Sequence, residues 1–227
     1  PGILDMPTAH PMHDGDISAT VGRFERTQRN VLHFQITPRL SGVFRYTYLG
    51  GYRARSTDSQ ENYYDRSFDL RYQITEETAS LPAIAVGLQD FGGTGIYAGE
   101  YLVASKTFGR LRATTGLGWG RLGSQGGFDN PLGILGDGFK TRPAQTGGIG
   151  QTGQVDTDHW FRGDAAVFGG LQYQATDRLV LNAEYSSDAY DAESERMDFE
   201  HNSPVNVGLT YRFASGVDLN AAYLYGS

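Results

Sequence analysis

The sequence contains no cysteine among its 227 residues, so it can form neither a disulfide framework nor a thiolate-bound metal centre. It also lacks any run of roughly 18 apolar residues, which excludes a membrane-spanning helix. The periodicity of amphipathic helices is almost absent. Basic residues are few, with 19 Lys and Arg against 26 Asp and Glu, and they form no stripe. The resulting net charge of −7 argues against a nucleic-acid partner.

Glycine, tyrosine and phenylalanine are abundant, and apolar and polar side chains alternate over long stretches. There are 31 Gly, 14 Tyr and 12 Phe, too many aromatic residues for a disordered acidic chain. Residues 205–213 read VNVGLTYRF, with apolar side chains at the odd positions and polar or small ones at the even positions. This period of two is typical of β-strands with one apolar face. The pattern predicts eleven strands, at 16–23, 30–37, 40–48, 65–75, 82–90, 96–107, 110–120, 161–174, 178–186, 204–213 and 217–225.

The links between these strands alternate in length, which defines the expected topology. Tight turns such as 37–39 and 214–216 alternate with long links at 49–64, 121–160 and 187–203. An antiparallel meander with one short-turn end and one long-loop end is typical of outer-membrane barrels. The sequence therefore predicts an all-β fold, an antiparallel up-and-down transmembrane β-barrel of about eleven or twelve strands. We expect a periplasmic or lumenal segment at 1–15 and the barrel domain at 16–227, with 121–160 as its long loop.

The two faces of the predicted strands differ in a way that favours a membrane. Aromatic residues on the apolar face lie near strand ends, where amphipathic rings prefer the edge of a bilayer. The opposite face carries charged side chains interleaved with glycines, which would pair across strands in a wet lumen. The candidate residues that line the lumen and contact a glycan are Arg45, Asp69, Arg71, Glu100, Arg112, Glu184, Arg212 and Asp218.

Motifs for cofactors and metals are weak. Residues 118–123, GWGRLG, satisfy a dinucleotide-binding pattern, but a loop follows where that site needs a helix, so we expect no cofactor. His10 and His13 have the spacing of helical metal ligands, but Pro11 argues against a helix there, so we expect no metal site. The acidic loops 156–159 and 187–201 suit either a solvated surface or divalent cations that bridge lipopolysaccharide.

Several segments in the first half of the chain resemble the YjbH/GfcD-like outer-membrane proteins. They include residues 2–9 (GILDMPTA), 44–48 (FRYTY), 64–69 (YDRSFD), 82–95 (PAIAVGLQDFGGTG) and 99–106 (GEYLVASK). The stretch 116–123 (GLGWGRLG) continues the likeness. The resemblance implies an outer-membrane barrel of Gram-negative bacteria that is linked to the production or export of exopolysaccharide or capsule. It implies no catalytic residues.

Members of that family are usually much longer and often carry a lipoprotein signal with an acylated cysteine. Eleven is also an odd number of strands, whereas single-chain bacterial barrels have even numbers. We therefore expect the chain to be part of a longer protein. Its expected partners are outer-membrane lipid, lipopolysaccharide, an anionic polysaccharide and other export proteins. The glycine-rich loop 123–153 is expected to contact the glycan or an export partner.

Two other classes of protein stay open at this point. A barrel-borne enzyme that hydrolyses or modifies polysaccharide or lipid would use carboxylates such as Glu100 and Glu184, although pairing with arginines is the favoured role of these groups. A soluble β-sandwich that binds a ligand would instead bury four apolar residues between two sheets, namely Phe68, Leu117, Leu181 and Leu209. We expect a non-catalytic barrel.

Overall fold

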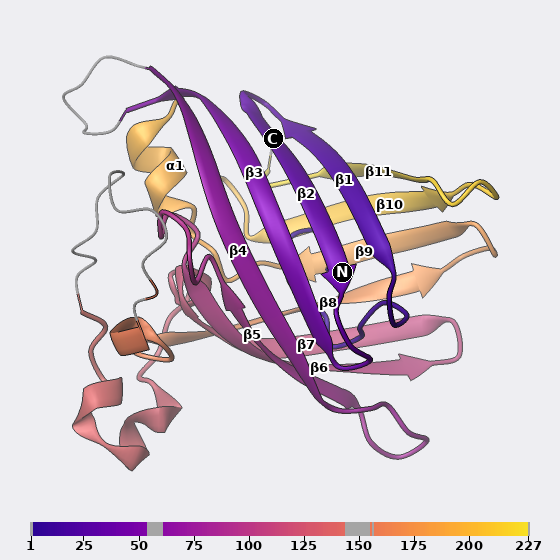
Figure 1. Ribbon diagram of the computed structural model, residues 1–227, viewed down its shortest axis with the longest axis horizontal. Coiled ribbons are helices and arrows are strands. Elements are labelled where there is room, and N and C mark those ends of the chain that lie inside the picture. Colours follow the sequence, from indigo (N-terminus) through magenta and orange to yellow (C-terminus); the bar gives the residue numbers. More distant parts are fainter. Residues whose placement is uncertain (1, 54–60, 144–154, 156, 227) are drawn as a thin grey trace.

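The computed structural model describes residues 2–53, 61–143, 155 and 157–226 (Figure 1). The chain is an all-β protein whose strands each pair with the next in an antiparallel meander. Within the described residues the eleven strands are β1 Ile17–Phe24, β2 Thr27–Gln35, β3 Leu40–Tyr52, β4 Glu61–Thr75, β5 Ala83–Gln89, β6 Gly99–Phe108, β7 Leu111–Gly120, β8 Ala165–Gln174, β9 Leu179–Tyr185, β10 Val205–Arg212 and β11 Asp218–Tyr223.

The predicted strands and their antiparallel order are confirmed, and the differences lie at strand ends. β3 continues to Tyr52 and β4 begins at Glu61, so both ends of the link expected at 49–64 belong to strands. β1 and β2 meet in a two-residue hairpin, in which Glu25 takes a positive φ of 48°. β8 begins at Ala165 rather than 161, because positive φ angles at Phe161 and Gly163 interrupt the extended backbone.

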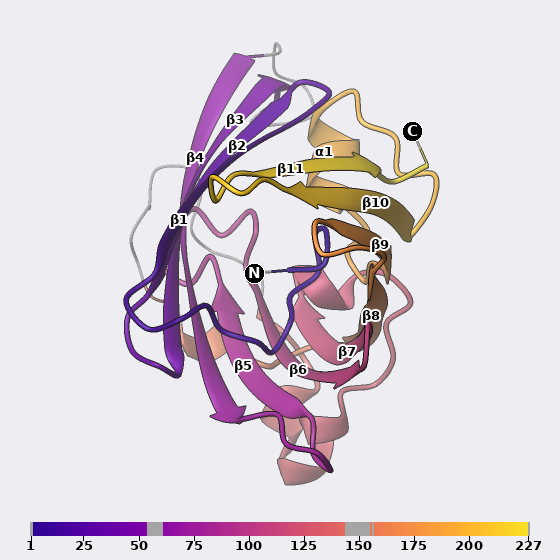
Figure 2. The same ribbon diagram turned by 90° about the vertical axis from the view of Figure 1, so that its right-hand side faces the viewer.

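The sheet curves strongly around an interior, but it is not closed. Figure 2 shows the strands wrapping around the N-terminal segment, with β1 and β11 at the two edges. Within the described part of the chain these two strands are not hydrogen-bonded to each other. The closed barrel expected from the sequence is therefore not shown, and the structure is one open, curved sheet.

The apolar face of the sheet is its outer face, and it is exposed. Phe68, Leu181 and Leu209 are 44%, 45% and 39% exposed, so they do not pack in a dry centre. Leu117, which a sandwich would also bury, is half-buried. The strands form a single sheet rather than two facing layers, unlike a β-sandwich. Other exposed apolar residues of the outer face are Ile17, Val21, Leu32, Tyr64, Tyr72, Leu102, Val167, Leu171, Val205, Val207, Leu219 and Tyr223.

The inner face carries most of the buried polar side chains. Because side chains alternate along a strand, the neighbours of the outer residues point inward. Buried polar groups on these inward positions are Gln35, Ser41, Thr47, Asp65, Ser67, Arg71, Gln73, Ser105, Thr114, Asn182, Glu184 and Asn206. The distribution of polarity is thus the reverse of that in a water-soluble β-protein, where the buried face is apolar.

Long connections gather at one end of the sheet and short turns at the other, as the sequence predicts. The long-loop end holds the helix α1, Asp191–Arg196, and the short 3₁₀ turns between β7 and β8 (Figure 1). The described residues include no helix that is both long and apolar enough to cross a bilayer.

Candidate functional site: the polar interior and the cavity at its loop end

The N-terminal segment, residues 2–12, runs through the interior of the curved sheet (Figure 2). It is tied there by Glu184 of β9, whose carboxylate is 2% exposed. The backbone N–H groups of Leu4, Asp5 and Met6 donate to this carboxylate at 2.9–3.2 Å. Asn206 of the neighbouring strand β10 donates to it from Nδ2 at 3.0 Å. One inward carboxylate therefore satisfies three consecutive backbone donors of a segment that has no strand partner.

Further contacts hold the same segment along its length. The Ala9 N–H donates to Ser105 Oγ at 3.0 Å, and Arg71 Nη1 donates to the Thr8 carbonyl at 3.2 Å. Met6 and Ala9 also join a small apolar cluster inside the sheet, with Ala83, Ala85, Tyr101, Val103, Leu122 and Phe168. The interior is therefore filled by the protein's own chain where the segment passes.

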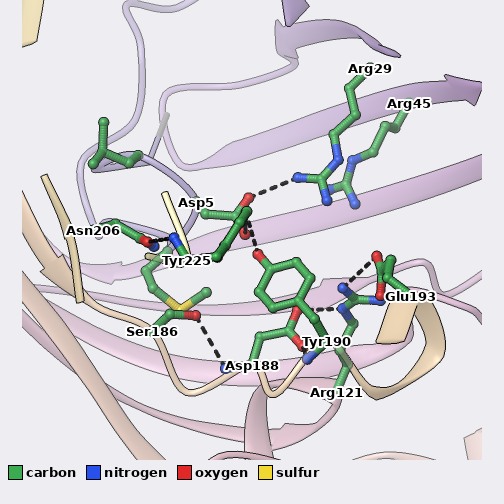
Figure 3. A network of polar contacts seen from close by, with 12 residues as sticks. Asp5, Arg29, Arg45, Arg121, Ser186, Asp188, Tyr190, Glu193, Asn206 and Tyr225 are labelled. Atoms are coloured by element: carbon green, nitrogen blue, oxygen red, sulfur yellow. Dashed lines mark hydrogen bonds and ion pairs between the residues drawn. The ribbon is translucent and has the colours of Figure 1, made fainter. Parts of the chain in front are cut away.

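Asp5 links this segment to a buried polar network (Figure 3). Arg29 of β2 donates to Asp5 Oδ1 at 2.9 Å, and the Tyr225 hydroxyl donates to Oδ2 at 3.1 Å. Burial alone would raise the pKa of Asp5, but the Arg29 and Arg121 guanidiniums outweigh it and lower that pKa below its usual value. Asp5 is therefore a half-buried carboxylate that stays ionised because it is paired.

Tyr225 connects the two edges of the sheet at the loop end. Its ring packs edge-on against Phe24 at the end of β1, with centroids 5.1 Å apart. Its backbone N–H donates to Asn206 Oδ1 of β10 at 2.7 Å, and its hydroxyl lies 2.7 Å from that of Tyr190. Contacts of Tyr225 thus link the two edges of the sheet, where β1 and β11 are not hydrogen-bonded to each other.

Arg121 is the second centre of the network (Figure 3). It forms ion pairs with Asp188 and with Glu193, the latter at 2.8 Å. Its guanidinium also lies over the rings of Tyr97 and Tyr190, 4.6 and 4.7 Å from their centroids. Burial raises the pKa of Asp188 to about 7, against the opposing effect of Arg121. These two acidic loop residues are therefore buried ion-pair partners rather than parts of a solvated surface.

The structure places most of the predicted lumen residues on the inner face, where several pair with one another. Arg45 and Asp69 form a largely buried ion pair between β3 and β4. Arg71 is buried and donates to Ser41 Oγ at 3.0 Å. Arg45 and Arg71 thus donate hydrogen bonds to groups inside the protein.

The other predicted residues on the inner face lie toward the short-turn end or join other groups. Arg212 and Asp218 lie 3.9 Å apart across β10 and β11 and are half exposed. Arg112 of β7 is half buried and donates to Thr107 Oγ1 at 3.4 Å. Glu184, as described above, holds the N-terminal segment.

Glu100 lies on the opposite face from the one expected. It is paired with Trp119 in the sheet register and is two residues from Leu102, whose side chain is on the outer face. The loop between β7 and β8 covers it, and Arg142 donates to both carboxylate oxygens, at 2.8 and 3.1 Å. The Phe161 N–H adds a third hydrogen bond at 2.9 Å. Glu100 is thus a loop anchor at the rim and does not line the interior.

A cavity of about 420 Å³ opens at the long-loop end. The loop between β5 and β6, the loop that follows β7 and the segment around α1 form its walls. Polar and charged lining residues are Gln89, Asp90, Thr94, Glu100, Arg121, Ser124, Arg142, His159, Asp188 and Asp191, and aromatic ones are Phe91 and Trp160. Of the loop 123–153 expected to contact a glycan, residues 144–153 lie outside the described residues, as do Gln154 and Asp156.

Asp90, which lines this cavity, is only partly hydrogen-bonded. Its Oδ2 accepts the Tyr97 N–H at 3.0 Å, whereas Oδ1 is buried and has no hydrogen-bond partner. Burial, with the neighbouring carboxylate of Asp65, raises the pKa of Asp90 to about 7. Burial therefore favours the neutral, protonated form of this carboxyl group.

The histidines considered as metal ligands have other partners. His10 Nε2 lies 2.7 Å from Glu77, and His13 lies 3.5 Å from Asp16 with its side chain almost fully exposed. Across the described ranges, no group of three or more His, Asp or Glu residues could hold a metal ion.

Sequence reasoning missed several residues of the network, namely Asp5, Arg29, Arg121, Arg142, Tyr190 and Tyr225. Arg29 was outside the predicted strand, which began at residue 30, although it faces inward from β2. Tyr225 fell inside the predicted strand 217–225, whereas β11 ends at Tyr223. The remaining missed residues lie in loops or in the N-terminal segment, where alternation gives no signal.

Comparisons with known proteins agree with the resemblance seen in the sequence. A family model described as the exopolysaccharide biosynthesis protein YbjH matches residues 1–227. The uncharacterized lipoprotein YjbH of Escherichia coli (strain K12) is 35% identical over 234 residues, which cover all of this chain. The chain spans about a third (32%) of the length of that relative. The match over the whole chain, together with the identity to the lipoprotein, shows that this protein belongs to the YjbH family of exopolysaccharide biosynthesis proteins.

Proposed function

We propose that the chain forms a wall of a transmembrane β-barrel in the Gram-negative outer membrane and assists the production or export of exopolysaccharide there without catalysing a reaction. The observation that carries the proposal is the reversed polarity of the sheet, with exposed apolar side chains outside and buried charged ones inside. Such an outer face is stable against acyl chains and costly against water. The lipoprotein relative and the family's link to exopolysaccharide biosynthesis support a place in the cell envelope.

A lipid setting also requires both edges of the sheet to be paired. Unpaired backbone groups of β1 and β11 would cost several kcal/mol each in hydrocarbon. The barrel is then closed either by direct pairing of these edges or by further strands between them. The Tyr225 contacts with Phe24 and Asp5 keep the two edges near each other at the loop end.

The interior supports a non-catalytic role. Glu184 accepts four hydrogen-bond donors, and the Arg45–Asp69 pair is internal, so these groups serve structure rather than a reaction. With the N-terminal segment inside the sheet, we propose that this part of the barrel is plugged and that glycan contact occurs at the loop end.

The test is made in the native host. Membranes are separated by density and the protein is located in the outer- or inner-membrane fraction. Deletion of the gene is expected to lower secreted polysaccharide, and restoring the full-length gene is expected to recover it. Recovery of the protein in the soluble fraction, or unchanged polysaccharide output in the deletion strain, would overturn the proposal. Release of new reducing ends from the secreted polysaccharide by the purified protein would instead support a barrel-borne enzyme.

A further inference from the structure

The outer face of β1–β4 changes from apolar to polar at one position in the strand register. These four strands lie side by side (Figure 1), and their outward side chains form rows across the sheet. Two rows toward the short turns hold only apolar side chains and one glycine: Ile17, Phe34, Gly42 and Leu70 in one, and Ala19, Leu32, Phe44 and Phe68 in the other. The next two rows toward the loop end are mostly polar: Val21, Asn30, Tyr46 and Arg66, then Arg23, Gln28, Tyr48 and Tyr64.

The two polar rows have the composition of a membrane interface. Tyr64 stacks on Tyr46, with ring centroids 5.8 Å apart, and lies 5.4 Å from the ring of Tyr48. The Gln28 amide donates to Asn30 Oδ1 at 3.1 Å. Tyrosine rings favour the depth at which hydrocarbon meets head groups. Because the long loops of such barrels are extracellular, this boundary would lie in the outer leaflet.

Arg23 and Arg66 give this surface its positive charge. Both side chains are exposed, and Arg66 lies over the ring of Tyr46, 5.6 Å from its centroid. Within the described ranges neither guanidinium has a carboxylate partner, whereas the inward Arg29 and Arg45 are ion-paired. A guanidinium presents a planar fork of donors that matches the oxygens of a phosphate. The two outward forks are therefore available to an anionic ligand.

A groove of about 410 Å³ lies beside Arg23, between the β1–β2 hairpin and the loop ends of β3 and β4. The Tyr48 hydroxyl donates to Asn62 Oδ1 at 2.9 Å, so an aromatic ring and an amide line its wall together. Its charged lining residues are Arg23, Arg26 and Glu25. The groove thus has one positive charge in excess. The ion pair that Arg26 forms with Asp198 is long, at 3.6 Å, and exposed, so it holds Arg26 only weakly.

The rest of the outer face lacks such free cations. Along the described β8–β11 the outward positions carry no Lys or Arg, and Val205 and Val207 keep the face of β10 apolar toward its loop end. The outward Lys106 of β6 pairs with Glu77 at 3.9 Å and donates to the Ala79 carbonyl at 3.0 Å. In a chain with a net charge of −7, the free positive charge of the outer strand positions is thus confined to β1–β4.

We propose that the outward loop end of β1–β4 binds the head group of lipid A, the phosphorylated and acylated diglucosamine that anchors lipopolysaccharide. Arg23 and Arg66 contact its phosphates, and its acyl chains cover the two apolar rows below. The two arginines are three strand spacings apart, about 14 Å, which suits a head group with a phosphate at each end. This inference rests on the proposed function, in which the outer face contacts lipid, and deepens it by naming one lipid and its contacts.

The contact is direct, unlike the divalent-cation bridges considered for the acidic loops. The test measures lipid binding to the full-length protein in a non-ionic detergent by native mass spectrometry. The probes are lipid A with two phosphates, with one and with none, and phosphatidylglycerol. Affinity is expected to fall in the order of two, one and no phosphates, to be lower for phosphatidylglycerol than for the two-phosphate form, and to persist in EDTA. Equal affinity for the phosphate-free form, tighter binding of phosphatidylglycerol, or loss of binding in EDTA would overturn the proposal.

Two variants and a control locate the site. Arg23→Gln and Arg66→Gln each remove one exposed charge, so we expect about tenfold weaker binding of the two-phosphate form and an unchanged unfolding midpoint. In the double variant the preference for phosphorylated lipid A is expected to disappear. Arg178→Gln, an exposed change in the turn between β8 and β9 at the short-turn end, is expected to bind like the wild type. Unchanged affinity in the double variant, or equal weakening by Arg178→Gln, would refute the site.

The outcome separates this site from the broader function. If lipid A does not bind, while the protein is in the outer membrane and its loss lowers polysaccharide output, only the lipid site is wrong. If lipid A binds and the arginine variants weaken it, but output is unchanged in the deletion strain, the lipid site stands and the proposed role in polysaccharide production fails.

Discussion

Replacing Glu184 by Gln is expected to release the N-terminal segment from the interior. The carboxylate accepts backbone donors from Leu4, Asp5 and Met6 and a side-chain donor from Asn206. Glutamine keeps one oxygen and turns an amide NH₂ toward the remaining donors, so at least one hydrogen bond is lost and one donor is left buried. A hydrogen bond to a charged group contributes about 1.5–3 kcal/mol, and an unsatisfied donor costs about 1–3 kcal/mol.

A net loss of about 3 kcal/mol corresponds to at least a hundredfold rise in local opening, because each 1.4 kcal/mol is a factor of ten. Amide hydrogen exchange of peptides from residues 2–9, measured in detergent, reports this opening. Glu195→Gln, an exposed change on α1, is the matched control and is expected to leave exchange unchanged. Protection within threefold of the wild type in Glu184→Gln would refute the idea that this carboxylate holds the segment.

Three further results are expected. A Cβ at residue 93 would lie 2.4 Å from the Arg66 carbonyl oxygen, so Gly93→Ala pushes the loop between β5 and β6 away from β4 and lowers the unfolding midpoint. Gly92→Ala, which has open space, leaves the midpoint within error, and equal midpoints for the two variants would contradict this close approach. The pKa of Asp90 is raised to about 7 from the ordinary value of 3.8, so between these two pH values the native state binds one proton more than the unfolded state. Stability should therefore fall by up to about 4 kcal/mol as pH rises through that window, and Asp90→Asn should reduce that fall in denaturant titrations. Arg121→Met leaves two carboxylates buried without their cation and is expected to cost about 3–5 kcal/mol, so an unchanged denaturation midpoint would argue against a buried ion-pair centre.

The strands were predictable because the alternation of side chains is a local property of the sequence. In residues 205–213 apolar and polar side chains alternate, so the sequence itself shows which side chains share a face of the strand. The antiparallel meander follows because short links join segments of this kind. The path of residues 2–12 was not predictable in this way. They have no period, and their position depends on Glu184, about 180 residues away in the chain.

The charge of Glu100 led to the prediction that it lines the lumen, whereas the structure places it on the outer face. It and Leu102 are two residues apart and must share a face, yet the charge alone had suggested the lumen. The outer position is tolerated because the loop with Arg142 folds over it, which only tertiary structure reveals. The cavity around Asp90 was likewise hidden from the sequence, since three separate loops build it.

The most direct test of the central claim compares two adjacent residues of β10. The chain has no cysteine, so Leu209→Cys and Thr210→Cys each introduce a single labelling site, on the outer and the inner face respectively. After reconstitution of the full chain in lipid vesicles, a fluorophore at residue 209 should be quenched by nitroxides on acyl chains, and one at residue 210 should not. Quenching of residue 210 alone, or access of a water-soluble quencher to residue 209, would contradict an apolar face in contact with lipid.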